Sequence, residues 1–96
     1  MAEAEEAIRS ASRSHGLTVA ERREEEFDRS RGVPEVCVRF KLPPSDVEVW
    51  LYSDGAELDT ALSSDVFEEW AFRTPQDFLG ELTAAVIEKA KTEPAV

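Results

Sequence analysis

The chain has 96 residues, a length that suits one small domain with a single modest core. It carries 21 acidic and 11 basic residues, and the formal net charge of −10 argues against direct binding to nucleic-acid phosphates or to anionic membranes. No apolar run approaches the roughly 18 residues that a membrane helix needs, and the amino terminus is acidic where a targeting peptide would be basic. We therefore expect a cytoplasmic protein.

The negative charge is concentrated in the second part of the chain. Residues 1–32 contain 8 acids and 6 bases, a net charge of −2, whereas residues 33–96 contain 13 acids and 5 bases, a net charge of −8. We therefore divide the chain into a charged arm over 1–32, a core domain over 33–92 and a tail over 93–96. The acidity fits either a salt-rich cytoplasm or a surface that binds a basic partner, and the composition does not separate the two.

The arm favours a helix in its first half. Residues 2–14 place Ala4, Ile8 and Ala11 on one side, but this apolar face is too small to hold a short helix firmly to a core. We expect a loosely attached helical arm with a regulatory or self-associating role, through which a homodimer can form. For residues 18–31, a solvated helix, an extended edge strand and disorder remain open, in that order.

Residues 36–52 contain the clearest pattern in the chain, two runs of period-two alternation that are typical of β-strands. The linker at 43–46 is rich in proline, serine and aspartate, which predicts a four-residue hairpin loop. The pattern favours a register with Val38 opposite Leu51, because a slip by one residue would turn the apolar row into water.

The polar face of this hairpin carries the residue types of greatest interest for binding. The same register places Arg39 beside Trp50, as a cation–π pair, and Lys41 beside Glu48. Arginine, tryptophan and tyrosine dominate binding hot spots, so the candidate partner-binding residues are Arg39, Lys41, Trp50 and Tyr52. The alternative is that these side chains form a second, smaller core or an amphipathic outer face.

The Asp-Gly pair at 54–55 is a strong hairpin signal and predicts a third strand over 57–62, with Leu51 opposite Leu58. Residues 66–72 then fit either a fourth strand or a short helix. The aromatic residues in this segment favour the strand.

The last helix has a well-specified start. Thr74 is the cap, Pro75 occupies the first helical position and Asp77 follows three residues after the cap. One arc of the helix is apolar: Phe78, Leu79, Leu82, Ala85, Val86 and Ala90. The sequence thus predicts an α+β two-layer domain, an antiparallel meander of three to four strands with a C-terminal helix packed on one face, plus a loosely attached helical N-terminal arm.

Motifs of catalysis and cofactor binding are missing from the sequence. It has no glycine-rich phosphate loop, no nucleophile elbow, and no pairs of histidines or cysteines at metal-ligand spacing. Cys37 alternates outwards from the apolar row without an identifiable activating neighbour, and His15 is read as an ordinary surface histidine. We therefore expect no enzymatic activity, no cofactor and no metal site.

These observations favour a small acidic protein that acts as a non-catalytic protein–protein interaction module. The alternative is an inhibitor, an immunity-type protein or a nucleic-acid mimic, which would hold a basic partner with clustered carboxylates. The acidic patch proposed for that role comprises Glu57, Asp59, Glu68 and Glu69.

Overall fold

The structure is a computed structural model that describes residues 2–28 and 34–92. One helix precedes five strands, and a second helix follows them. The elements are α1 Ala2–Ser14, β1 Ala20–Asp28, β2 Pro34–Lys41, β3 Glu48–Tyr52, β4 Gly55–Asp59, β5 Ser64–Glu68, the short 3₁₀ helix η1 Glu69–Ala71, and α2 Pro75–Thr92.

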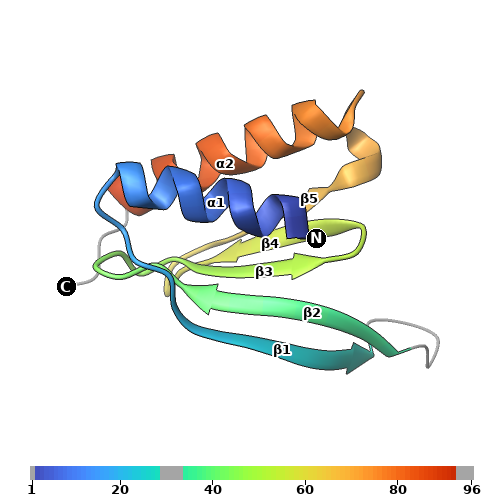
Figure 1. Ribbon diagram of the computed structural model, residues 1–96, viewed down its shortest axis with the longest axis horizontal. Coiled ribbons are helices and arrows are strands. Elements are labelled where there is room, and N and C mark those ends of the chain that lie inside the picture. The colour runs from blue at the N-terminus through green and yellow to red at the C-terminus, as the bar shows by residue number, and fades with distance from the viewer. Residues whose placement is uncertain (1, 29–33, 93–96) are drawn as a thin grey trace.

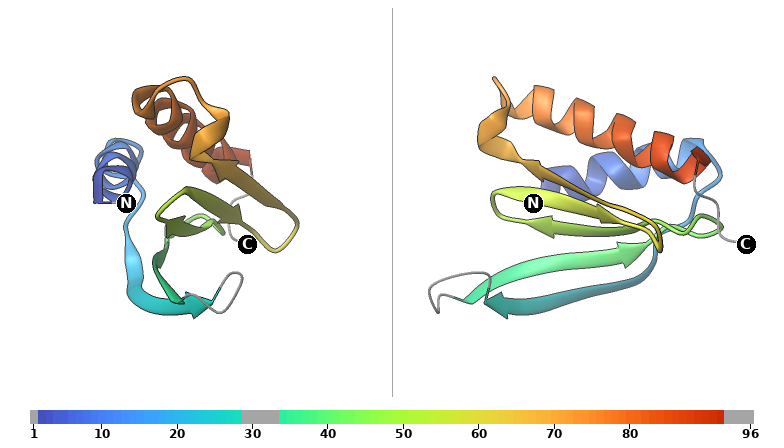
Figure 2. Two further views of the ribbon diagram at one scale, coloured as in Figure 1. Left: turned by 90° about the vertical axis from the view of Figure 1, so that its right-hand side faces the viewer. Right: turned by 180° about the vertical axis from the view of Figure 1, so that it is seen from behind.

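The five strands form one antiparallel meander in the order β1-β2-β3-β4-β5. Both helices lie side by side on one face of the sheet (Figure 1), and the views of Figure 2 show the same two-layer arrangement. This confirms the predicted α+β class, the antiparallel sheet and the packing of the C-terminal helix on one face. Neither helix in the described ranges is long and apolar enough to cross a membrane.

The central hairpin of β2 and β3 has the predicted register. Val38 pairs with Leu51 and Phe40 pairs with Val49, and all four side chains are almost completely buried. The backbone N–H of Leu42 donates to the carbonyl oxygen of Val47 at 3.1 Å, which closes the loop. The alternation of apolar and polar residues was sufficient to predict this register, because one face of the strand pair is buried.

The two-residue turn between β3 and β4 lies one residue earlier than predicted, at residues 53–54. Leu51 lies opposite Ala56 instead of Leu58, and β4 ends before position 62. The register differs by two residues from the prediction. The apolar side chains stay on the core face all the same, because side chains alternate along a strand with a period of two.

Residues 20–28 form the edge strand β1, so the helix that ranked first for residues 18–31 is wrong there. Glu24 pairs with Val38 on β2, and the ladder continues to the end of the strand. The pairing edge of β2 is a long-range feature, which outweighs the local helix preference of a charged segment. Residues 29–31 of that prediction lie outside the described part of the chain, as does the tail predicted over 93–96.

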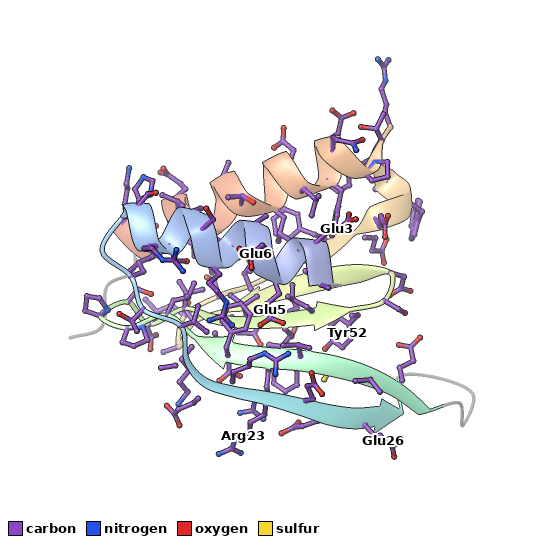
Figure 3. The ribbon with its side chains drawn as sticks, in the orientation of Figure 1. Glu3, Glu5, Glu6, Arg23, Glu26 and Tyr52 are labelled. Carbon is purple, nitrogen blue, oxygen red and sulfur yellow. The ribbon has the colours of Figure 1, made fainter. Side chains whose placement is uncertain are left out.

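The helix α1 contributes to the core. Ile8 is fully buried and Ala4 nearly so, and both belong to one apolar cluster with the sheet and α2. Glu5 points from α1 towards the sheet (Figure 3), and Arg22 Nε of β1 donates to Glu5 Oε2 at 2.7 Å. The structure therefore does not show the loose attachment that the small apolar face indicated.

The second helix begins as predicted, with the backbone N–H of Asp77 donating to Thr74 Oγ1 at 3.0 Å. Its core face buries Phe78, Leu82 and Val86 against the sheet. Residues 66–72 divide between the two structures that the sequence allowed. Strand β5 extends to Glu68, and the 3₁₀ turn η1 follows directly.

Candidate partner-binding surface

The candidate surface is the face of the sheet opposite the two helices (Figures 1 and 2). We call it the open face. Its side chains alternate with the buried ones along β2, β3, β4 and β5, and its central residues are Arg39, Lys41, Glu48, Trp50, Tyr52, Glu57, Asp59 and Val66. All four predicted partner-binding residues therefore lie on the same face.

Arg39 and Trp50 occupy the centre of the open face. They are directly opposite on β2 and β3, and Arg39 Cζ lies 4.7 Å from the centroid of the Trp50 ring. Two carboxylates flank the same guanidinium, since Glu25 Oε1 and Glu48 Oε2 each lie 3.6 Å from its nitrogens. The predicted cation–π pair is confirmed, and the guanidinium of Arg39 also forms ion pairs with Glu25 and Glu48.

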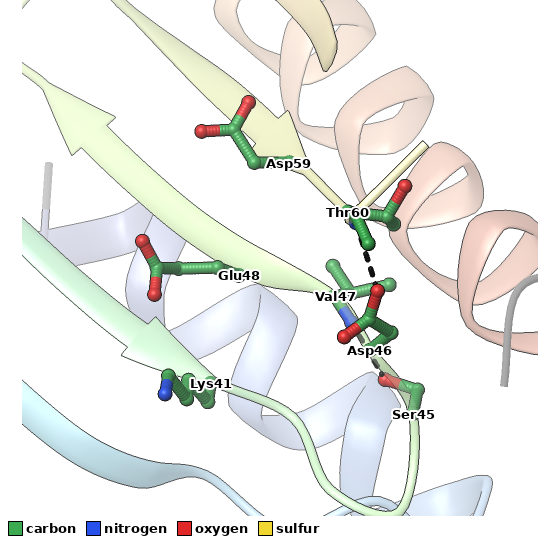
Figure 4. Close-up of a pocket in the computed structure, with 8 residues that line it drawn as sticks. Lys41, Ser45, Asp46, Val47, Glu48, Asp59 and Thr60 are labelled. Carbon is green, nitrogen blue, oxygen red and sulfur yellow. Dashed lines mark hydrogen bonds between the residues drawn. The ribbon is translucent and has the colours of Figure 1, made fainter. Parts of the chain in front are cut away.

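Lys41 stands at one end of this row. Its backbone pairs with Glu48, as predicted, but its ammonium lies 3.5 Å from Glu21 Oε2 of the neighbouring strand. A hollow of about 330 Å³ opens beside it between β2, β3 and the end of β4 (Figure 4). The rim is fixed by Asp46, whose Oδ2 accepts a hydrogen bond of 2.8 Å from the backbone N–H of Ala61.

The structure spreads the predicted acidic patch along the β4–β5 hairpin. Glu57 lies opposite Trp50, and Asp59 lies opposite Glu48 on the open face. Glu68 is at the other end of the hairpin, where it pairs with Gly55. Glu57 and Asp59 therefore lie beside the candidate partner-binding residues, whereas Glu68 lies at the other end of the hairpin.

Glu57 is a carboxyl on the open face whose pKa departs from its ordinary value. Burial raises its pKa, and the adjacent carboxylate of Asp59 raises it further through a side-chain hydrogen bond and like-charge repulsion. A cationic group placed beside Glu57 and Asp59 would favour the charged form of both carboxyls. The β4 strand thus presents negative charge next to the central tryptophan.

Trp70 is a surface residue that the sequence analysis did not select. It is 77% exposed on η1, and the nearby Val66 of β5 is 65% exposed. A hollow of about 260 Å³ lies between Trp70 and the Tyr52 end of the open face. The signal was a tryptophan in a segment that fits a strand or a helix, with the strand favoured, and the direction of its ring depends on where β5 ends.

The cysteine and the histidine carry no further site. Cys37 is fully buried, and desolvation raises the pKa of its thiol, which disfavours the reactive thiolate. His15 is exposed at the end of α1, with Nδ1 3.0 Å from the carbonyl oxygen of Ala11. Within residues 2–28 and 34–92, no three His, Cys, Asp or Glu side chains are grouped as a metal site.

A second concave surface lies between the two helices, on the side away from the sheet. It is a groove of about 630 Å³ whose walls are largely apolar, among them Ala7, Ala11, Leu79, Ala84 and Ile87. Because α1 supplies one wall of this groove, it is the described surface that best suits the self-association predicted for residues 1–32.

No protein-family model matches the sequence, and searches of curated proteins and of solved structures found no similar protein. The function is therefore inferred from the surface chemistry of the chain itself.

Proposed function

We propose that this protein is a non-catalytic module that binds another protein through the open face of its sheet. The observation that carries the proposal is the Arg39–Trp50 pair, with 4.7 Å between guanidinium carbon and ring centroid, at the centre of that face. Arginine and tryptophan are the residue types most enriched in binding hot spots. Stacking also fixes the long arginine side chain before a partner arrives, which reduces the entropy lost on binding.

The position of this pair within the sheet supports the proposal. Trp50 lies on the middle strand of five, with paired strands on both sides. The residues that flank it on β3, Val49 and Leu51, are buried in the core. A hot spot on such a strand keeps its geometry better than one on a loop, and a preformed surface binds with a smaller reorganisation cost.

The alternative function, an inhibitor or immunity-type protein or a nucleic-acid mimic for a basic partner, is favoured by one specific observation. Glu57 and Asp59 stand side by side on β4, and burial together with the neighbouring Asp59 carboxylate raises the pKa of Glu57. A cationic cleft would stabilise both carboxylates in their charged form. In that case association would be steered by charge and weakened strongly by salt.

A capture experiment at low and high salt separates the two functions. The immobilised wild type is compared with Trp50→Ala, with the double variant Glu57→Gln/Asp59→Asn, and with Leu62→Ala as an exposed control away from the open face. The module predicts partners that Trp50→Ala loses at both salt concentrations. Partners that dissociate at high salt, and that the double variant loses while Trp50→Ala retains them, would favour the alternative function. Partners retained by both open-face variants would contradict both functions.

A further inference from the structure

We infer that the partner-binding surface extends beyond the open face to Trp70, and that the partner segment seated there carries arginine. The inference rests on the proposed function, because it names the partner chemistry of the same surface. Its starting point is the exposed apolar patch of Val66 and Trp70, which are 65% and 77% exposed. Adjoining exposed apolar side chains with a polar rim are typical of protein-interaction sites.

Trp70 is presented on a fixed turn. The backbone N–H of Glu69 donates to the carbonyl oxygen of Asp54 at 2.9 Å, and the N–H of Phe72 donates to the carbonyl oxygen of Glu69 at 3.1 Å. Phe72 also packs edge-to-face on Phe78 of α2, with 5.5 Å between ring centroids. The residues on both sides of Trp70 are thus anchored while its own ring stays in solvent.

The Trp70 patch is continuous with the proposed binding face. The hollow of about 260 Å³ beside Trp70 is also lined by Tyr52, a predicted partner-binding residue, and by Glu57, which lies opposite Trp50. Val66 lies opposite Glu57 on the next strand. A single extended segment of a partner would therefore contact Trp50 and Trp70 together.

The charge in the hollow between Trp70 and Tyr52 favours a cation. Three acidic residues line this hollow, Asp54, Glu57 and Glu68, and its described lining contains no basic residue, whereas Arg73 lines the hollow on the other side of Trp70. An arginine side chain meets both features, since its planar guanidinium stacks on an indole ring and donates in pairs to carboxylates. A lysine ammonium is a strongly hydrated point charge that lacks the planar stacking surface, so the site should prefer arginine.

The test uses a synthetic peptide of alternating glycine and arginine, with counterparts in which every arginine is replaced by lysine or by the neutral isostere citrulline. The indole N–H signals of the ¹⁵N-labelled full chain report on each tryptophan separately. The arginine peptide should shift the Trp70 signal saturably and bind about fivefold more tightly than the lysine peptide, a factor that corresponds to about 1 kcal/mol. The citrulline peptide should leave the signal unchanged.

Variants assign the effect to the patch. Followed through the Trp50 indole signal, which both variants retain, Trp70→Ala and Glu68→Gln should each weaken binding of the arginine peptide at least about fivefold. Leu62→Ala, at the far end of the β4–β5 hairpin and 87% exposed, is the matched control and should bind like the wild type. Equal binding of the citrulline or lysine peptide, or binding unaffected by Trp70→Ala, would overturn the inference.

The proposed function and its extension to Trp70 can be refuted separately. If a partner contacts the open face at Tyr52 and Trp70→Ala leaves that contact unchanged, the extension to Trp70 is wrong and the proposed function stands. If no partner contacts Tyr52, the proposed function is wrong, whatever the peptide does at Trp70.

Discussion

Lys89 of α2 places its ammonium 2.9 Å from Asp65 Oδ2 of β5 and donates to Ser63 Oγ at 2.6 Å, although the lysine is only 7% exposed. This link fastens the last turn of the helix to the beginning of the edge strand. The polar tip of an otherwise buried lysine thus depends on partners at the sheet edge.

We expect the two sides of this link to respond unequally to substitution. Asp65→Ala removes the carboxylate while the ammonium stays largely buried, and should lower the free energy of unfolding by about 1–3 kcal/mol. Lys89→Met keeps the apolar stem, removes the charge and should cost less than about 1 kcal/mol. Urea unfolding at neutral pH measures both, and a larger loss for Lys89→Met than for Asp65→Ala would contradict this account.

Two glycines should respond to alanine with opposite signs. A Cβ at Gly55 would collide with the carbonyl oxygen of Phe67, so Gly55→Ala should lower the free energy of unfolding by about 1–3 kcal/mol. A Cβ at Gly80 on α2 would meet nothing within 4 Å, and Gly80→Ala should raise it by about 0.5–1 kcal/mol. Each variant serves as the control for the other in thermal unfolding. Stabilisation by Gly55→Ala would contradict the close approach of β4 and β5, and destabilisation by Gly80→Ala would contradict the open space beside α2.

Glu5 and Glu57 should contribute to the pH dependence of stability in opposite directions. The hydrogen bond from Arg22 holds the pKa of Glu5 below its ordinary value, so the stability contributed by Glu5 is complete at neutral pH. That contribution is lost as the pH falls below the ordinary glutamate value of about 4.3 and through the lowered pKa. We expect Glu5→Gln to destabilise the protein at neutral pH and to have a smaller effect in acid.

For Glu57 the pKa is raised, because burial and the carboxylate of Asp59 disfavour its charged form. The charged side chain therefore costs stability at neutral pH, and this cost declines as the pH falls below the raised pKa and is gone below the ordinary glutamate value. Glu57→Gln should accordingly stabilise the protein at neutral pH. Chemical unfolding at neutral and acidic pH measures both variants; destabilisation by Glu57→Gln at neutral pH would refute the assigned repulsion.

The buried position of Ile8 predicts that residues 1–32 are needed for folding. Ile8→Ala should lower the free energy of unfolding by about 2–5 kcal/mol, the usual cost of truncating a large core residue. Deleting residues 1–32 removes α1 and β1 together and should leave the remainder without a cooperative unfolding transition. An intact, stable remainder would restore the original expectation of a loosely attached arm.

Self-association through residues 1–32 stays a prediction, and a point variant tests it without unfolding the chain. Ala11 lines the groove between α1 and α2, where Ala11→Glu would place a charge on the apolar wall. If the chain forms dimers through this groove, sedimentation velocity should show them for the wild type and monomers for Ala11→Glu. A monomeric wild type, or a dimer unchanged by the substitution, would rule out this groove as the contact.

The fold could be predicted where the signal was local and one face was buried. The pairing of Val38 with Leu51 and the cap at Thr74 are both readable from neighbouring residues, and both are confirmed. The edge strand β1 could not be predicted in this way. Its residues are charged on both faces, and their strand conformation comes from pairing with β2, which alternation within the segment does not reveal.

The candidate surface shows the same division. Arg39 and Trp50 were found because strand register brings them together and register was readable. Trp70 was missed because its exposure depends on β5 ending at Glu68, where a 3₁₀ turn carries the ring out of the sheet. The extent of burial of Ile8 was also hidden, since a thin apolar stripe becomes a core contact only when α2 lies beside it.

The central claim is that the open face, not the helical layer, contacts a protein partner. Its most direct measurement is photo-crosslinking in cells that produce the full chain with p-benzoylphenylalanine in place of Tyr52, and separately in place of Glu81. Glu81 is exposed on α2, whereas Tyr52 is on the open face. The account predicts a discrete crosslinked protein from position 52 that Trp50→Ala abolishes, and none from position 81. Crosslinks from position 81 alone, or crosslinks from position 52 unaffected by Trp50→Ala, would contradict it.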